Sequence, residues 1–175
     1  MTISQYHNAG DDHKSFALFS NDEKYRYILE RVWNGAEKRI LFIMLNPSTA
    51  DAKKNDPTVK RCCDFAKMWG YGTIVVANLF AYRSTHPEAL VTIDNPIGPE
   101  NMEHIRKAMD SADTIVAAWG NNVLPNFHMH TVYAVNDYAK KIGKDIMCLG
   151  ITDSGQPSHP LYIKAYTRLK IWRKA

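Results

Sequence analysis

The chain has 175 residues, of which 45% are hydrophobic and 23% charged, and its net charge is +4. This length suits one domain, and the composition is that of an ordinary globular protein rather than of a disordered or fibrous chain. The small positive charge is compatible with a nucleic-acid partner but does not require one.

Residues 1–14 are polar, and we expect them to be flexible within a single domain that spans residues 1–175. Residues 15–33 read as two extended segments around Asn21-Asp22-Glu23, which predicts an N-terminal hairpin. An amphipathic helix is the alternative for this stretch.

Four later segments are short apolar runs without strict alternation, which is typical of parallel strands buried on both faces. Helices are expected between them, and Asp56-Pro57 is a good helix start because Asp caps and Pro fits the first turn. This rhythm predicts a three-layer α/β domain with a central parallel sheet. The expected strands are 39–45, 73–77, 114–118 and 145–149, and the expected helices are 56–68, 98–111 and 128–141.

Ligands of such folds bind beyond the carboxyl ends of the strands, so the polar residues found there are the candidates. Asn46 follows the first strand and precedes Pro47 and Ser48, although an Asx turn that only ends the strand is the alternative. Asn78 follows the second strand. We expect Asn46 and Asn78 to share one cleft with the candidates from the other two loops.

The loop after Asn78 contains Tyr82, Arg83 and His86, a mixture that suits a nucleobase with a nearby phosphate. A solvent-exposed charge is the alternative for Arg83. The third strand runs into Trp119, a core residue or a ligand platform, and then into Gly120, which permits a sharp turn.

The fourth strand runs into a loop in which His159 lies between Pro157 and Pro160, with Tyr162 after it. Long ordered loops of this kind often carry function, and a structural histidine is the alternative. Cys62, Cys63 and Cys148 include no Cys-x-x-Cys pair, so we expect no metal site and no cofactor. Free thiols, a polar N-terminus without a signal-peptide core and the lack of a long apolar run predict a cytoplasmic protein without a membrane anchor.

These loops together closely resemble a family called domain of unknown function 1643, which has no established activity. The resemblance covers most of the chain and includes motifs on the hairpin, on the first helix and after each strand. The motifs that carry this resemblance are Tyr25-Arg26-Tyr27, Leu45-Asn46-Pro47-Ser48-Thr49-Ala50, Asp56-Pro57-Thr58, Asn78-Leu79-Phe80-Ala81-Tyr82-Arg83, Trp119-Gly120 and His159-Pro160-Leu161-Tyr162.

More distantly, the layout resembles the uracil-DNA glycosylase superfamily, which implies a four-stranded parallel sheet in the order 2-1-3-4. It also implies that Asn46 positions a water, that Asn78 hydrogen-bonds the base, and that His159 stabilises the departing base. Leu161 follows His159-Pro160 where that superfamily usually has Ser, and Met44-Leu45 stand where it usually has a Gly.

The hypothesis that follows is hydrolysis of the N-glycosidic bond to a damaged or modified base in DNA, flipped out of the stack. Asp51 or Asp56 would assist the water held by Asn46. A hydrolase of a free nucleotide or nucleoside, or a non-catalytic binder of a modified base in DNA, are the alternatives. The expected base site comprises Pro47, Ser48, Asn78, Tyr82, Trp119, Gly120 and Tyr162, with Phe65 or Trp69 as further stacking candidates, and the expected phosphate site comprises Arg61, Arg83 and His86.

Overall fold

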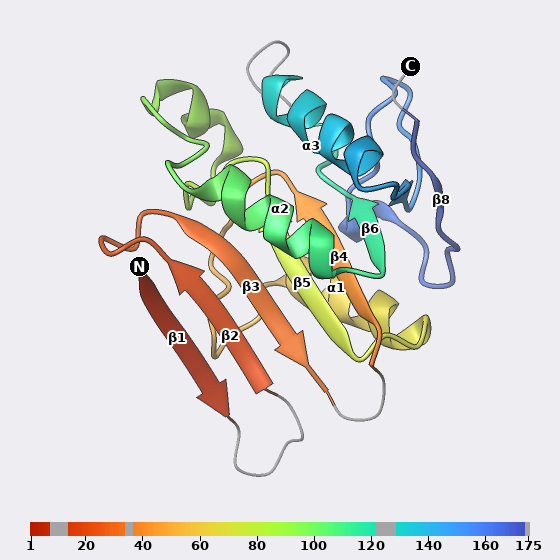
Figure 1. Ribbon diagram of the computed structural model, residues 1–175, viewed down its shortest axis with the longest axis horizontal. Coiled ribbons are helices and arrows are strands. Elements are labelled where there is room, and N and C mark those ends of the chain that lie inside the picture. The colour runs from red at the N-terminus through yellow and green to blue at the C-terminus, as the bar shows by residue number, and fades with distance from the viewer. Residues whose placement is uncertain (8–13, 34–36, 122–128, 174–175) are drawn as a thin grey trace.

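The computed structural model describes residues 1–7, 14–33, 37–121 and 129–173. In these ranges one mixed sheet has eight strands in the order β1-β2-β3-β5-β4-β6-β7-β8 (Figure 1). Their bounds are β1 Thr2–His7, β2 Lys14–Phe19, β3 Arg26–Val32, β4 Arg39–Met44, β5 Thr73–Asn78, β6 Thr114–Ala117, β7 Ile146–Cys148 and β8 Lys170–Ile171.

The centre of the sheet is parallel: β4 pairs with β5 and β6, and β6 pairs with β7. The four strands expected from the apolar runs are confirmed to within one residue at each end, and their order is the expected 2-1-3-4. The runs are apolar throughout because both faces are covered, and every side chain of β5 is buried.

Helix α1 (Pro57–Met68) covers one face of the sheet, and helices α2 (Asn101–Ser111) and α3 (Met129–Lys141) cover the other (Figure 1). Asp56 caps α1 as expected, because its carboxylate accepts a hydrogen bond of 2.8 Å from the Val59 amide. Two short 3₁₀ turns, η1 (Pro87–Thr92) and η2 (Pro160–Tyr162), interrupt the loops.

Helix α2 begins three residues later than expected, because Gly98 adopts a φ of +89° that no helix can include. A side chain at Gly98 would also lie 2.9 Å from the Tyr25 ring. Helix α3 agrees with the expectation from Met129 onward, and His128 lies outside the described residues.

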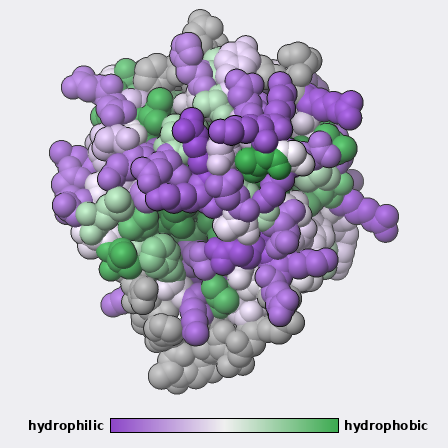
Figure 2. Space-filling view, viewed as in Figure 1, coloured by the Kyte–Doolittle hydropathy of each residue, from purple (hydrophilic) through white to green (hydrophobic). Residues whose placement is uncertain are grey.

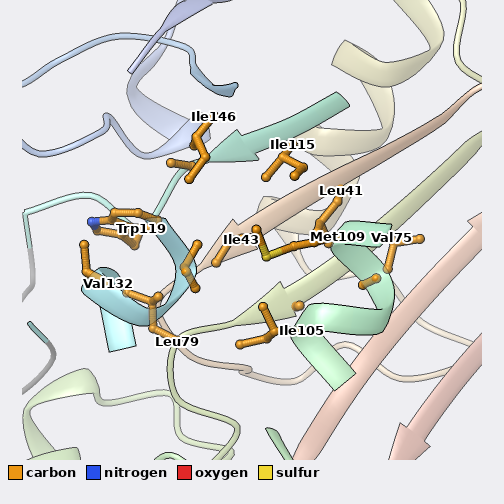
Figure 3. Packing of buried hydrophobic residues seen from close by; sticks show 14 of the residues in the cluster. Leu41, Ile43, Val75, Leu79, Ile105, Met109, Ile115, Trp119, Val132 and Ile146 are labelled. Atoms are coloured by element: carbon orange, nitrogen blue, oxygen red, sulfur yellow. The ribbon is translucent and has the colours of Figure 1, made fainter. Parts of the chain in front are cut away.

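The core lies in two layers because alternate side chains of β4 point to opposite faces. Ile40 and Phe42 pack towards α1, whereas Leu41 and Ile43 pack towards α2 and α3. Figure 3 shows the second layer, in which side chains of the parallel strands meet those of the two helices and Trp119.

The expected N-terminal hairpin is confirmed and the helical alternative is wrong, since β2 and β3 pair in antiparallel fashion. β3 also pairs with β5, so the hairpin extends the central sheet. Residues 1–14 were expected to be flexible, but Thr2–His7 forms β1 on the free edge of β2, where unpaired backbone groups accept a strand whatever its polarity. Residues 8–13 lie outside the described ranges.

Strand β8 was not expected, and it pairs with β7 over two residues at the other edge of the sheet. The face shown in Figure 2 is largely hydrophilic over α2 and α3. Within the described ranges, no helix is long and apolar enough to span a bilayer.

Candidate functional site

A small polar pocket of about 110 Å³ lies at the carboxyl ends of β4 and β5, and we call it the small pocket. Asn46, Asn78, Trp119 and His159, which were expected to share one cleft, all line it. Its remaining lining comes from strands β3, β4 and β5, from loops and from the start of α1: Arg26, Met44, Leu45, Ser48, Asp56, Thr58, Val59, Val76 and Pro87.

Asn46 follows β4 with a side chain that is fixed by the main chain of two loops. Its amide nitrogen Nδ2 donates to the Ser84 carbonyl at 2.8 Å and to the Pro47 carbonyl at 3.2 Å. These bonds assign the two ends of the carboxamide. The oxygen Oδ1 is therefore the end of Asn46 that remains available as an acceptor for a ligand or a water.

Asn78 is the last residue of β5 and is 1% exposed. Its backbone carbonyl is held by the side chain of Asn101 at 2.9 Å. By contrast, the side-chain nitrogen Nδ2 of Asn78 is buried and has no hydrogen-bond partner in the described part of the chain. An unpaired buried donor is costly, so a ligand atom that accepts from it would lower the free energy of the folded protein.

Arg26 begins β3 and is 2% exposed, yet it lines the small pocket. Its Nη1 donates to the Ala50 carbonyl at 2.6 Å, whereas its Nε is buried and lacks a partner among the described residues. Burial lowers the pKa of Arg26 to about 10. The carboxylate of Asp56 opposes that shift, but its effect is smaller than that of burial. The guanidinium therefore stays charged at neutral pH, and no carboxylate of the described residues forms an ion pair with it.

Asp56 and His159 bring an acceptor and a donor to the same pocket. His159 immediately precedes η2, and its Nδ1 accepts a long hydrogen bond of 3.4 Å from the Leu161 amide. Burial lowers the pKa of His159, and the nearby Asp56 partly opposes that shift. His159 is therefore neutral at pH 7, with its proton on Nε2, which makes Nε2 a hydrogen-bond donor.

A second hollow of about 230 Å³, which we call the larger cavity, shares Trp119 and His159 with the small pocket. Its other lining residues are Gly120, Asn121, Thr152, Ser158, Tyr162 and Ile163. His159 and Trp119 are therefore side chains that a ligand in either hollow would contact. A third cavity, of about 450 Å³, is lined by residues of α3, β7 and β8 and contains none of the residues that the sequence singled out.

Trp119 and Gly120 shape the boundary between the two hollows. Trp119 is 1% exposed, packs edge-on against Trp172 and donates from Nε1 to Gln156 at 3.0 Å. It is therefore a core residue that also lines both hollows. Gly120 has a φ of +76°, and a Cβ there would lie 3.1 Å from the Cβ of His159. The absence of a side chain at Gly120 lets His159 approach the end of β6.

The structure places one expected catalytic residue and several expected base-site residues elsewhere. Asp51 closes a turn by accepting hydrogen bonds from the Lys53 and Lys54 amides at 2.7 and 2.8 Å, and it does not line either hollow. The ring of Tyr82 packs edge-on against Tyr25, and Pro47 is buried but does not line the small pocket. Phe65 and Trp69 stack on each other at the end of α1 and do not line the small pocket either.

The three expected phosphate ligands are also outside both hollows. Arg61 donates to the Ile163 carbonyl, and Arg83 donates to the Glu23 carbonyl at 3.1 Å. His86 is exposed and lies 3.3 Å from a carboxylate oxygen of Glu88. Arg61 and Arg83 are thus held by main-chain carbonyls, whereas Arg26, which the sequence did not mark as a site residue, lines the small pocket.

A family model described as protein of unknown function (DUF1643) matches residues 26–161. The match begins at Arg26 and includes every residue that lines the small pocket. No curated protein and no solved structure matches the chain significantly. In the described ranges, no group of three or more His, Cys, Asp or Glu side chains is placed to hold a metal ion.

Proposed function

The chain belongs to the DUF1643 family of proteins of unknown function, and we propose that it hydrolyses the N-glycosidic bond of a nucleotide in DNA. The small pocket receives a damaged or modified base, and the larger cavity receives the sugar. His159 lines both hollows, so in this arrangement it lies close to the bond that breaks.

The observation that carries the proposal is the pair of buried donors without partners, Nε of Arg26 and Nδ2 of Asn78, on one small pocket. A ligand with two or more acceptor atoms on one edge would satisfy both, and the ring edges of nucleobases have such atoms. The volume of about 110 Å³ is well below the roughly 300–1,000 Å³ of sites for drug-sized ligands. It suits a single ring rather than a whole nucleotide.

The chemistry follows from the available atoms of Asn46, Asp56 and His159. Oδ1 of Asn46 accepts a hydrogen bond from a water, and the carboxylate of Asp56 takes the water's proton as its oxygen bonds to C1′ of the sugar. The C1′–N bond breaks, and its electron pair stays with the base. Nε2–H of His159 donates to the departing base, and such electrostatic stabilisation is often the largest single catalytic effect.

The likeness to the uracil-DNA glycosylase superfamily supports the same roles for Asn46, Asn78 and His159. The strand order 2-1-3-4 is the order that this likeness implies. Because a fold does not fix a function, the roles depend on the side chains of the pocket and not on the sheet.

Hydrolysis of a free nucleotide or nucleoside is the second candidate, and one observation favours it. Arg61 and Arg83, the cations expected to hold the phosphates of a DNA strand, both donate to main-chain carbonyls. A nucleoside needs only the two hollows, which those arginines do not line.

The test is single-turnover release of free base from uracil-containing, deaminated and hypermodified DNA, single-stranded and duplex, with the matching nucleosides and nucleotides alongside. We expect release from at least one modified DNA. Release from the free compounds alone would select the second candidate. Tight binding of a modified DNA without release would replace hydrolysis with recognition of the base.

A further inference from the structure

The C-terminal part of the chain has a charge that differs from that of the rest. From Ser154 to the end, the sequence contains five Lys or Arg residues and no Asp or Glu. The net charge of the whole chain is +4, so the residues before Ser154 are close to neutral together. The positive charge is therefore local, which is typical of a surface that meets a polyanion.

Four exposed side chains of this part form what we call the C-terminal track: Lys164, Tyr166, Arg168 and Lys170. In the described part of the chain, none of its three cations forms an ion pair. Tyr166 is 88% exposed, and Tyr162, which lines the larger cavity, is 84% exposed. They are the most exposed of the large hydrophobic residues among those described, and both lie in this basic stretch.

The backbone beneath the track is held in place. Arg61 of α1 donates to the Ile163 carbonyl, and Nε1 of Trp69 donates to the Thr167 carbonyl at 3.3 Å. The side chains of Ile163 and Leu169 pack into the core under α1. Because these inward anchors alternate with the outward side chains, the track is an ordered surface rather than a loose tail.

A turn in the middle of the track presents Tyr166 to solvent. The Thr167 amide donates to the Lys164 carbonyl at 3.3 Å, and the Thr167 hydroxyl donates to the same carbonyl at 2.9 Å. Tyr166 lies between these residues, so its ring projects from a closed turn. The chain then reaches β8 at the edge of the sheet opposite the N-terminal strands (Figure 1).

We propose that the C-terminal track binds a single strand of nucleic acid that leaves the larger cavity past Tyr162. Exposed rings provide stacking platforms for bases, and unpaired Lys and Arg side chains between them attract the phosphates. Tyr162 and Tyr166 are four residues apart, so their backbones are at most about 14 Å from each other, a span of a few nucleotides. The inference rests on the proposed function only in that the bound strand presents its base to the small pocket.

The test is fluorescence anisotropy of a labelled twelve-residue oligothymidylate at several salt concentrations. The triple variant K164Q/R168Q/K170Q should reduce the slope of log affinity against log salt by about 2, since each phosphate contact on a single strand contributes about 0.7. The matched control is K14Q/K38Q/K141Q, which removes the same charge from exposed lysines elsewhere. The control should keep the wild-type slope, and equal slopes for both triples would overturn the proposal.

Tyr166 tests the stacking contribution separately from charge. Tyr166→Ala should weaken oligothymidylate binding by about 5- to 100-fold, the usual effect of losing one stacked base, and Tyr166→Phe should restore it. The proposal would be contradicted if Tyr166→Ala bound the oligonucleotide with wild-type affinity. It would also be contradicted if the protein bound anionic vesicles but not the oligonucleotide. If the wild-type protein binds the oligonucleotide with the expected salt slope but releases no base from modified DNA, the proposed function alone is contradicted and the C-terminal track stands.

Discussion

Two arginines on β3 differ in how their hydrogen-bonding capacity is met, although both are buried. Arg31 is 6% exposed and donates to Asn55, to its neighbour's carbonyl and to the Asp51 carbonyl through Nε, Nη1 and Nη2. Arg26 is 2% exposed and donates to the Ala50 carbonyl, while its Nε has no partner among the described residues.

Both side chains donate to main-chain carbonyls of the same loop after β4, so the two share a structural role. Arg31 is satisfied by the protein itself, and its role is to hold that loop. Arg26 lines the small pocket, and its buried Nε has no partner among the described residues. Burial alone therefore does not separate a structural cation from a binding one, but unmet hydrogen-bonding capacity does.

The largest expected effect in this comparison is on stability. Arg31→Met should lower the free energy of unfolding by roughly 3–5 kcal/mol, because it leaves several buried acceptors of the loop unpaired. Arg26→Met should lower it by less than about 1 kcal/mol, since the same change removes a buried charge without an ion-pair partner. Urea denaturation measures both, and equal losses would break the comparison.

The next largest effect concerns the chemical step. Asn46→Ala and His159→Ala should each slow base release by about a hundredfold or more, the usual result of losing one electrostatic group in the transition state. Binding of an uncleavable substrate analogue should change little in either variant, because both groups act on the transition state. Asn78→Ala should instead reduce discrimination between bases. Single-turnover rates and analogue affinities for the three variants check this.

Arg26 should affect ligand binding more than Arg31 does. Arg26→Met should weaken binding of the substrate base by about tenfold or more, since a hydrogen bond from a charged donor contributes roughly 1.5–3 kcal/mol. Arg26→Lys keeps the charge but loses the planar fork, so it should recover only part of the affinity. Affinity for the uncleavable analogue is the measurement. Full affinity in Arg26→Met would assign the unmet donor to a bound water.

The sheet was accessible from sequence because its signal is local. Each parallel strand is buried on both faces, so the apolar runs at 39–45 and 73–77 mark it directly. Strands β1 and β8 carry no such signal, since an edge strand forms by backbone pairing and needs few apolar side chains.

Part of the candidate site was accessible for a related reason. Asn78 ends β5 and Asn46 lies just beyond β4, and the carboxyl ends of these parallel strands meet at one edge. Arg26 begins β3, whose antiparallel pairing with β5 brings its first residues to that same edge, and this pairing is not visible in the local sequence. The hydrogen bond from Arg83 to the Glu23 carbonyl could not be foreseen, because the two residues lie far apart in the chain.

Substitutions at two glycines test how His159 is positioned. Gly120 and Gly143 both have positive φ, +76° and +67°, so Ala at either should cost about 1–2 kcal/mol of stability. Only at Gly120 would the new Cβ meet another residue, the Cβ of His159 at 3.1 Å. Gly120→Ala should therefore slow base release, and Gly143→Ala should destabilise the fold with release unchanged. Rates and unfolding curves for both variants distinguish strain from contact.

The smallest effect is the contribution of His159 to acid sensitivity. Burial lowers the pKa of this imidazole, so the folded protein binds its proton less readily than the unfolded chain does. As the pH falls below about 6.5, the ordinary value for histidine, the unfolded state takes up the proton first and stability declines. The contribution is fully present above that value and continues to fall until the pH reaches the lowered pKa of the folded state.

His159→Asn removes this titration, so its unfolding midpoint should fall less than that of the wild type between pH 7.5 and pH 5.5. His104, whose pKa burial also lowers, should leave part of the acid sensitivity in that variant. Urea midpoints at the two pH values decide the matter. If His159→Asn were as acid-sensitive as the wild type, His159 would not be held neutral in the folded protein, and a neutral Nε2–H donor to the departing base would lose its basis.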